Sequence, residues 1–317
     1  MMRCLCCGKE LIRQNDINIG WHTKCVKRFF GVTVLPHIDI SNNAVEELVS
    51  RSIGKRNTVA GVQKKMSLHL EVQDMPRLTI MDYPTGFIMK PQTKEYKHMP
   101  EYEHLSMLMA EAVGIKTAEH ALIQTGSDFS YITKRIDRSF ENDMVKKYAM
   151  EDFCQISERL TLDKYKGSYE QCGKVIRTYS SHSGLDIAEF FIRVVFSFFI
   201  GNSDMHLKNF SLIEIEPGSR LYELSAAYDM LPVNLILPED TEQTALMLNG
   251  KRKNIRRKDF LRFAENIGVE TKTASRMIDD LISKMNKCLK LCDESFLDED
   301  EKESFKDLVK ERISIIS

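Results

Sequence analysis

The sequence predicts an α+β fold of two lobes, a β-rich N-terminal lobe and an all-helical C-terminal lobe. The chain has 317 residues, of which 43% are hydrophobic and 29% charged, so it is long enough to build two lobes around a large core. Short strand-like segments continue to about residue 135, and long segments with apolar residues at helical spacing follow. We therefore expect a Cys-rich segment at residues 1–30, the N-terminal lobe at 31–135 and the helical lobe at 136–317.

Composition favours a cytoplasmic protein. The formal net charge is −1 and the isoelectric point is about 6.7, so no overall basic field indicates binding to nucleic acid or to an anionic membrane. The first residues lead straight into cysteines with no secretion signal, and the eight cysteines are therefore expected to be thiols or metal ligands. The most apolar window, residues 187–200, is interrupted by charges and is shorter than the roughly 20 residues that a membrane-spanning helix needs. It is expected to be a buried core helix.

The expected N-terminal lobe alternates between strands and two helices. A capping-box pattern of Asn43 and Glu46 begins the first helix, and Gly114 ends the second. The expected helices cover residues 43–53 and 100–113, and the expected strands cover residues 66–70, 78–81, 86–90, 121–123 and 130–133.

The second half of the chain is expected to be helical. Helices are predicted to open at 149–155 and to cover residues 169–180, 185–200, 258–267, 271–291 and about 298–313. Strand-like pieces are expected just before Asp229 and within the loop at 233–248. The acidic run that opens the last helix favours the helix dipole.

The N-terminal cysteines are spaced like zinc ligands. Cys4 and Cys7 form one close pair, and after fourteen residues His22 and Cys25 form a second. Two such pairs supply the four soft or borderline ligands of a tetrahedral structural zinc site. The alternative is a small hairpin whose thiols simply pack. A nucleic-acid-binding finger is disfavoured, because no strongly basic recognition helix follows.

The segment Gly201–Phe210 carries the strongest chemical signal. Asp204 and Asn209 are five residues apart, which is the spacing of a kinase catalytic loop. In such a loop the aspartate accepts the proton of the substrate hydroxyl and the asparagine binds Mg²⁺. Asp229, about twenty residues later, stands where a kinase keeps its second Mg²⁺ ligand. Any one of these residues alone is more typical of a turn or a helix cap, so the prediction rests on their joint spacing.

Upstream residues supply the expected nucleotide site. Lys90 ends an apolar strand, and the first turn of the next helix offers Glu103, preferred here over Glu101, as the ion-pair partner that directs a lysine to the phosphates of ATP. A basic loop at residues 54–65 is expected to cover the phosphates with its backbone N–H groups, principally those of Thr58, Val59, Ala60 and Gly61. The backbone of Lys134, Arg135 and Ile136 is expected to stand free at a hinge and to meet adenine.

Together these motifs resemble the HipA-like serine/threonine kinases of bacterial toxin–antitoxin systems. The matching segments lie between about residues 30 and 290: Thr58–Lys65, Gly86–Lys90, Glu101–His104, Lys134–Arg138, Glu151–Gln155, Ile200–Phe210 and Tyr228–Asp229. The chain lacks the N-terminal subdomain of full-length HipA-like proteins and opens with the cysteine motif instead. In this respect it looks like the short HipT-like toxins of three-gene HipBST-type systems.

The resemblance implies a role for each matching residue. Asp204 would be the catalytic base, and Lys208 would steady the γ-phosphate. His206, counted with the nucleotide-binding residues, would brace the loop by a backbone hydrogen bond; the alternative is a structural histidine. Asn209 and Asp229 would hold Mg²⁺, and Lys90 would bind the phosphates of ATP. Thr58 stands where the family often has an autophosphorylated serine, and Lys134 replaces a hinge glutamate.

The resemblance also implies the partners. The implied substrate is a protein of the aminoacyl-tRNA synthetase class, whose phosphorylation would inhibit translation. A small HipS-like protein and a helix-turn-helix HipB-like antitoxin are the implied partners, with DNA reached only through the antitoxin.

Two other functions remain open from the residues alone. One is a non-catalytic regulatory or binding protein on a degenerate kinase fold, against which the intact Lys90, Asp204, Asn209 and Asp229 argue. The other is a small-molecule or phosphoinositide-type kinase, and the absence of a basic membrane-binding run in the sequence disfavours lipid substrates.

Overall fold

The computed structural model describes residues 2–38, 65–72, 75–80, 85–141 and 144–317. The chain forms two compact units. Unit 1 comprises Met1–Leu105, Ala118–Val145 and Glu294–Leu297, and unit 2 comprises Ser106–Thr117, Lys146–Asp293 and Asp298–Ser317. The helix expected at 43–53 lies outside the described residues.

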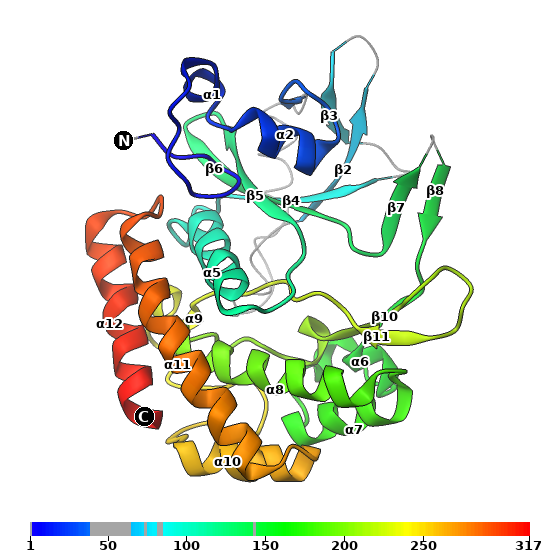
Figure 1. Ribbon diagram of the computed structural model, residues 1–317, viewed down its shortest axis with the longest axis vertical. Helices are drawn as coiled ribbons and strands as arrows, with labels where there is room; N and C mark the ends of the chain where they lie inside the picture. The colour runs from blue at the N-terminus through cyan, green and yellow to red at the C-terminus, as the bar shows by residue number, and fades with distance from the viewer. Residues whose placement is uncertain (1, 39–64, 73–74, 81–84, 142–143) are drawn as a thin grey trace. The chain divides into compact units, whose positions relative to one another are not determined.

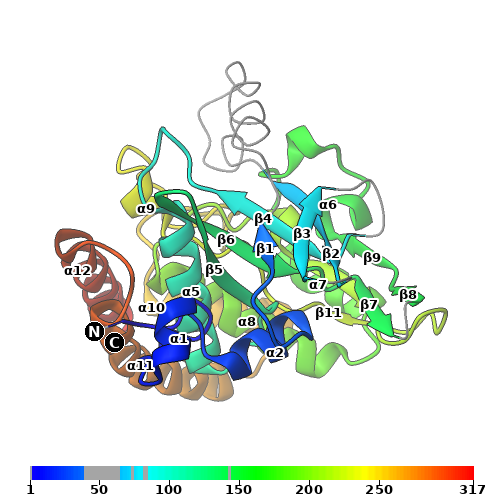
Figure 2. The same cartoon turned by 90° about the horizontal axis from the view of Figure 1, so that it is seen from above.

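A six-stranded sheet forms the centre of unit 1 (Figure 2). Its strand order is β1-β3-β2-β4-β6-β5, with β1 and β3 parallel and the other pairs antiparallel. Side chains alternate between the two faces of a strand, so Phe87 and Met89 lie on one face and Lys90 on the other. The strands are β1 (His37–Ile38), β2 (Met66–Glu71), β3 (Arg77–Ile80), β4 (Phe87–Pro91), β5 (His120–Thr125) and β6 (Asp128–Lys134).

The Cys-rich N-terminal segment shares its hydrophobic core with this sheet. It contains α1 (Gln14–Ile19) and α2 (Thr23–Phe30). The ring centroids of Phe29 and Phe30 on α2 lie 5.7 and 5.4 Å, respectively, from the ring centroid of Phe87 on β4. The N–H of Leu122 on β5 donates to the carbonyl of Leu5 at 2.8 Å. Apolar burial and a backbone hydrogen bond therefore both attach the segment to the sheet.

Beyond β6 the chain forms a hairpin that the sequence did not predict. Its strands are β7 (Arg138–Glu141) and β8 (Met144–Lys147), and among the described strands each pairs only with the other. The helix expected at 100–113 is present as α5 (Met99–Val113). It begins in unit 1 and ends in unit 2.

Unit 2 is built around the buried helix α8 (Ser183–Phe199). Figure 1 shows α8 beside α7, α10 and α11, and α12 also contacts it. Nine of its apolar and small residues are buried, together with Asp186 and Arg193. The guanidinium of Arg193 donates to Glu189 and to the carbonyl of Ser225. The other helices are α6 (Phe153–Ile156), α7 (Tyr169–Tyr179), α9 (Val233–Ile236), α10 (Arg257–Ile267), α11 (Thr271–Asp293) and α12 (Glu299–Ile316).

The α+β fold is confirmed, but the second half of the chain is not all helical. It contains an antiparallel sheet of β9 (Met150–Asp152), β10 (Ser211–Glu214) and β11 (Tyr222–Leu224), in the order β11-β10-β9. The helix expected to open at residue 149 therefore begins only at Phe153, where Asp152 and Gln155 form a capping box. β9 pairs with a strand about sixty residues further along the chain, so its local sequence does not reveal its partner.

The strand-like pieces expected at 233–248 also differ from the structure. That segment opens with the short helix α9, and no strand is assigned to it. Instead, the described loop makes isolated bridges, one of which joins Ser168 to Met247. A loop of apolar residues that is buried by tertiary packing has the same local pattern as a strand.

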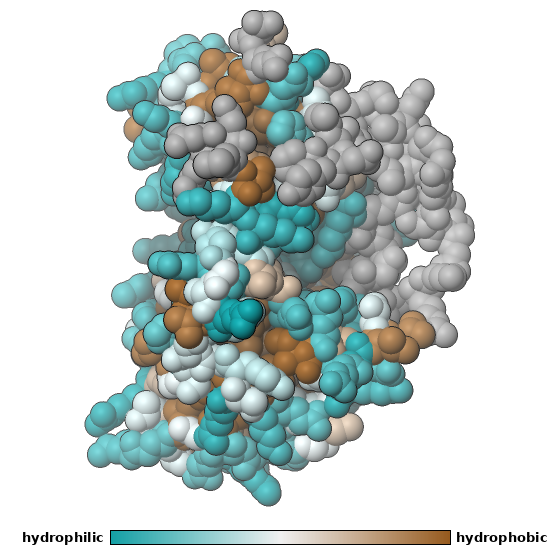
Figure 3. Space-filling view, turned by 90° about the vertical axis from the view of Figure 1, so that its right-hand side faces the viewer, coloured by the Kyte–Doolittle hydropathy of each residue, from teal (hydrophilic) through white to brown (hydrophobic). Residues whose placement is uncertain are grey.

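Exposed large hydrophobic residues are scattered. On the face drawn in Figure 3 the hydrophobic residues form separate small patches among hydrophilic ones. Within the described ranges, no helix combines the length and the apolar character required to cross a membrane.

Candidate active site

The loop after α8 has a fixed backbone conformation. Gly201 adopts a left-handed conformation with φ +70°, and a Cβ atom there would lie 2.6 Å from Cδ2 of Leu308. The N–H of Asn202 donates to the carbonyl of Ser197 at 2.8 Å. The hydroxyl of buried Tyr169 donates to the carbonyl of Met205 at 3.0 Å. The loop therefore turns away from α8 at Gly201 and is held on both sides of Asp204.

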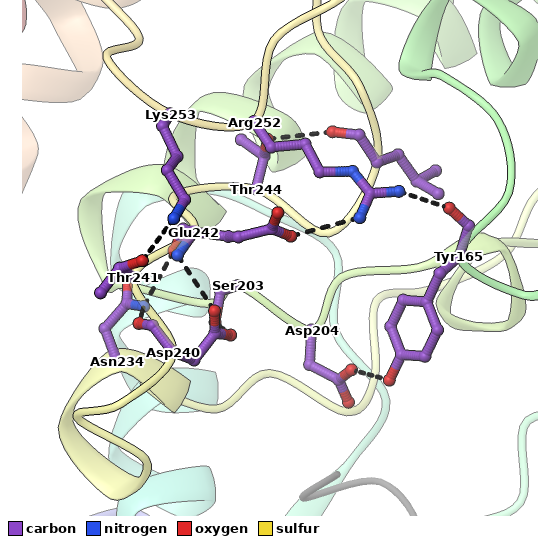
Figure 4. A network of polar contacts seen from close by, with 11 residues as sticks. Tyr165, Ser203, Asp204, Asn234, Asp240, Thr241, Glu242, Thr244, Arg252 and Lys253 are labelled. Atoms are coloured by element: carbon purple, nitrogen blue, oxygen red, sulfur yellow. Dashed lines mark hydrogen bonds and ion pairs between the residues drawn. The ribbon is translucent and has the colours of Figure 1, made fainter.

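Asp204 is held in a setting suited to a general base. The Tyr165 hydroxyl donates a hydrogen bond to Oδ1 of Asp204 (Figure 4). The N–H of Asp204 donates to Oδ1 of Asn202 at 3.2 Å. Burial raises the pKa of Asp204 to about 6, while the hydrogen bond from Tyr165 and the charge of Lys164 act in the opposite direction. A carboxylate with a pKa near 6 is ionised at neutral pH and remains basic enough to accept a proton.

A polar network positions Tyr165 and the loop that carries Asp204 (Figure 4). Arg252 donates to the carbonyl of Tyr165 at 2.7 Å and forms an ion pair with Glu242 at 3.2 Å. On the other side, the Ser203 hydroxyl donates to Oδ2 of Asp240 at 2.7 Å. Both ends of this network come from the loop between α9 and α10, which carries no motif in the sequence. Sequence reasoning therefore missed Tyr165, Asp240 and Arg252.

His206 and Lys208 lie within the same loop. The His206 ring packs edge-on against the Tyr165 ring, with centroids 5.1 Å apart and an interplanar angle of 75°. The carbonyl of His206 accepts from the N–H of Asn209 at 2.9 Å, which forms the turn of η2 (Leu207–Asn209). Nζ of Lys208 lies 2.6 Å from Oδ2 of Asp152, the residue that caps α6.

Asn209 and Asp229 lie next to each other. Nδ2 of Asn209 donates to the backbone carbonyl of Asp229 at 3.4 Å. Asp229 itself has a left-handed backbone with φ +56°, and such strain in a non-glycine residue is frequent at functional sites. The neighbouring Tyr228 hydroxyl donates to the carbonyl of Lys208 at 3.1 Å and contacts the Ser211 hydroxyl at 2.5 Å. An amide oxygen and a carboxylate form a hard oxygen donor set that fits Mg²⁺.

In unit 1, the lysine of β4 forms a buried ion pair. Nζ of Lys90 lies 2.5 Å from Oε1 of Glu103, and the side chains are 3% and 0% exposed. The Lys90 ammonium also lies 5.2 Å from the centroid of the Tyr131 ring. Glu101 contacts His98 at 3.3 Å. The pairing of Lys90 with Glu103 rather than with Glu101 is therefore present in the structure.

Two N–H groups of the expected hinge are already hydrogen-bonded within unit 1. The N–H of Lys134 donates to the carbonyl of Glu119 at 2.9 Å, and the N–H of Arg135 donates to the carbonyl of Gly86 at 2.9 Å. The prediction that these two N–H groups stand free to meet adenine is wrong, because β6 extends through Lys134. After Ile136 the chain enters the β7–β8 hairpin and passes to unit 2 between Val145 and Lys146.

The residues of the expected phosphate loop, Thr58, Val59, Ala60 and Gly61, lie outside the described residues.

The four expected zinc ligands lie within the described residues. Cys4, Cys7, His22 and Cys25 come together with their ligand atoms all within 4.8 Å of one another.

Comparison with known proteins identifies the family. The model of the HipA-like C-terminal domain matches residues 57–289, which is most of the chain. The chain therefore belongs to the HipA-like C-terminal domain family, as its motifs indicated.

Curated relatives carry kinase names. The chain is 36% identical over 202 residues to the Sinorhizobium fredii protein named "Putative kinase Y4dM". This match covers 59% of this chain and 47% of the relative. It is 24% identical over 265 residues to a Haemophilus influenzae protein named "Putative kinase", with 76% of each chain covered. The chain thus spans about half the length of the first of these relatives.

Solved structures share the fold. HipA of Shewanella oneidensis, solved as a complex with HipB and its operator DNA, matches 87% of this chain and 70% of its own, with a TM-score of 0.71 and 18% identity. The proinflammatory kinase CtkA of Helicobacter pylori matches 75% of this chain and 87% of its own, with a TM-score of 0.55 and 18% identity.

Proposed function

We propose that the protein is an ATP-dependent protein serine/threonine kinase that acts as the toxin of a bacterial toxin–antitoxin system. The observation that supports this most is the setting of Asp204, an aspartate with a pKa of about 6 that is positioned by Tyr165 in a loop also carrying Lys208 and Asn209. Membership of the HipA-like family and the kinase names of the relatives support the same reaction class.

The proposed reaction is transfer of the γ-phosphoryl group of ATP to a protein hydroxyl. Asp204 accepts the hydroxyl proton while the substrate oxygen forms a bond to the γ-phosphorus. The bond from that phosphorus to the bridging oxygen breaks, and ADP leaves with the electron pair. Mg²⁺, held when bound by Asn209 and Asp229, would neutralise phosphate charge.

Other residues bind and orient the nucleotide in this proposal. Lys90, held by Glu103, is assigned to the α- and β-phosphates, because a lysine fixed by an ion pair meets them in a defined direction. Lys208 is assigned to the γ-phosphate. In this role its ammonium would leave its ion pair with Asp152 and bind the phosphate instead. His206 supports the loop through its contact with Tyr165.

The proposed substrate and partners follow from the family resemblance. The substrate is an aminoacyl-tRNA synthetase, and the partners are a helix-turn-helix HipB-like antitoxin and a small HipS-like protein. The structure of HipA with HipB and operator DNA supports a HipB-like partner by analogy.

Phosphoryl transfer from labelled ATP in the presence of Mg²⁺ to the proteins of a bacterial lysate tests the function. We expect label on serine or threonine of a discrete protein, identified by mass spectrometry. Asp204→Ala should lower the rate by roughly 10²–10⁴, because it removes the base. The control Asp307→Ala changes an exposed carboxylate of α12 and should keep the wild-type rate.

Two results would count against the proposal. If Asp204→Ala labels proteins as fast as the wild type does, Asp204 is not the base. If label appears on a small molecule or a lipid and on no protein, the small-molecule kinase alternative is correct.

We also propose that Thr58 is autophosphorylated. A phosphate there would add a charge of about −1.5 to −2 to a basic loop and would repel the phosphates of ATP, switching the kinase off. Mass spectrometry of the active protein and of Asp204→Ala tests this. Phosphate on Thr58 in the active form alone is expected, and its absence from both forms would contradict autophosphorylation.

A further inference from the structure

We propose that Cys4, Cys7, His22 and Cys25 bind one structural zinc ion, and that this ion fixes the N-terminal segment onto the sheet that carries Lys90. The metal site is independent of the proposed kinase activity. Nδ1 of His22 lies 3.5 Å from Sγ of Cys7 and 3.9 Å from Sγ of Cys25. Ligand atoms around a tetrahedral zinc ion stand about 3.3–3.8 Å apart, given zinc–ligand bonds of about 2.0–2.3 Å. All four ligand atoms lie within 4.8 Å of one another, so a small contraction would bring them to zinc-binding distances.

Hydrogen bonds outside the ligand atoms orient this set for a metal. Nε2 of His22 lies 3.1 Å from the carbonyl of Glu10. In the tautomer that donates a hydrogen bond from Nε2–H to this carbonyl, Nδ1 keeps its lone pair facing the thiols. Zinc-bound histidines characteristically donate their second ring N–H to a carbonyl or carboxylate. The N–H of His22 donates to Sγ of Cys4 at 3.3 Å, a contact that a thiolate strengthens.

Local backbone structure brings each ligand pair into place. The N–H of Gly8 donates to the carbonyl of Cys4 at 2.9 Å, and Gly8 has φ +67°, so the chain turns back directly after Cys7. Asp16 accepts hydrogen bonds from both the N–H and the hydroxyl of Thr23, at 3.0 and 2.7 Å. That contact holds the start of α2, which carries Cys25.

The ion would matter to the whole of unit 1, because the segment between the two ligand pairs is part of its core. Trp21 is fully buried, and its ring centroid lies 5.8 Å from that of Phe29 and 5.5 Å from that of Phe30. The same core cluster contains Met89 of β4, the residue before Lys90. Loss of the metal would release the segment and expose this apolar surface.

Cys6 provides a matched control. It is buried in the same segment, but its Sγ accepts from the guanidinium of Arg28 at 3.5 Å and it is not a member of the ligand set. The proposal therefore separates two adjacent cysteines, Cys6 and Cys7, of which only Cys7 binds the metal.

The experiment measures the metal content of the full chain purified without chelator. We expect about one zinc ion per chain for the wild type and for Cys6→Ala, and a loss of zinc for Cys7→Ser and His22→Ala. Replacement by Co²⁺ should give the thiolate-to-cobalt charge-transfer absorption and the intense visible bands of tetrahedral cobalt. Chelator should lower the thermal midpoint of the wild type and of Cys6→Ala.

His22→Cys covers the case in which the other variants fail to fold. It offers four thiolates, so it should retain the metal and increase the charge-transfer absorption of the cobalt form. A wild-type chain without zinc that also fails to bind added Co²⁺ would overturn the proposal. A loss of metal from Cys6→Ala equal to that from Cys7→Ser would overturn the assignment of the ligands.

Discussion

At the residue scale, Asp204 and Tyr165 form a pair whose chemistry depends on pH. Burial raises the pKa of Asp204, and the Tyr165 hydrogen bond stabilises the ionised carboxylate and limits that rise. A general base works only when it is ionised, so the rate of phosphoryl transfer by the wild type should fall as pH decreases through about 6. Tyr165 is in this sense a positioning residue, because it acts through the carboxylate.

Tyr165→Phe tests this dependence. Removal of the hydroxyl takes a hydrogen bond from the ionised form, so the pKa of Asp204 should rise and the acidic limb of the pH–rate profile should move to higher pH. Lys164, Asp229 and Asp240 also act on this carboxylate and are unchanged in the variant. The full pH–rate profile of each protein is the measurement. Tyr179→Phe, which removes the hydroxyl of an exposed tyrosine of the same unit, should leave the profile in place.

A profile of Tyr165→Phe that superimposes on that of the wild type would show that the hydroxyl does not tune the base. A lower rate at every pH with no shift would assign Tyr165 a purely structural role.

At the element scale, the turn that joins α8 to the loop carrying Asp204 depends on Gly201. An alanine there would have to adopt φ +70° and approach Leu308 of α12 closely. We expect Gly201→Ala to lower the free energy of unfolding by about 1–3 kcal/mol. Gly184→Ala, in the first turn of the same helix, meets no atom within 4 Å and should raise it by about 0.5–1 kcal/mol.

Denaturant unfolding of both variants gives the measurement. Equal effects of the same sign would show that the turn does not require a glycine, and a gain in stability for Gly201→Ala would contradict the strain argument directly.

A buried histidine pair joins α5 to β5 in unit 1. Nδ1 of His104 lies 2.9 Å from Nδ1 of His120, an arrangement in which one ring donates and the other accepts. Burial, with the neighbouring His120 as the smaller cause, holds the pKa of His104 well below 6.5. Below about pH 6.5 the unfolded chain therefore binds a proton that the folded chain does not, and stability must fall as the solution becomes more acidic.

The expected slope is at most about 1.4 kcal/mol per pH unit, and it should extend from about pH 6.5 down to the folded pKa. His104→Asn keeps a polar atom near Nδ1 without a titratable ring and should lose most of this slope. His37→Asn, at an exposed position of the same unit, should keep it. The measurement is the free energy of unfolding of each protein at several pH values. An unchanged pH slope in His104→Asn would exclude His104 as the origin of the slope.

The elements that the sequence predicted well are those whose pattern is local. The strand ending at Lys90 and the helix carrying Glu103 follow from their own apolar periodicity, and a short turn sets the spacing of Cys4 and Cys7. β9 and the hairpin β7–β8 were missed because short strands owe their conformation to partners rather than to propensity. Tyr165 was missed because it reaches Asp204 across 39 positions of the chain with no motif to mark it.

At the scale of the whole molecule, the proposed function gives residues of each unit a part in nucleotide binding. The proposed function assigns Lys90 of unit 1 to the phosphates and Asp229 of unit 2 to Mg²⁺, whereas Asp204 acts only in the transfer step. A ligand that binds the folded chain alone stabilises it by about 2.7 kcal/mol at 100 times its dissociation constant. A non-hydrolysable ATP analogue with Mg²⁺ should therefore raise the thermal midpoint of the wild type.

The variants separate binding from chemistry. Lys90→Met and Asp229→Asn should lose most of the stabilisation by the nucleotide, whereas Asp204→Asn should retain it although its rate of phosphoryl transfer is strongly reduced. Lys310→Met and Asp307→Asn remove an exposed ion pair of α12 and serve as matched charge controls that respond like the wild type. Because each variant is compared with itself with and without nucleotide, a change in its intrinsic stability cancels. If the nucleotide raises the thermal midpoint of Lys90→Met as much as that of the wild type, Lys90 does not contribute to nucleotide binding. If it does not raise the midpoint of Asp204→Asn, this carboxylate is needed for binding and not only as a base.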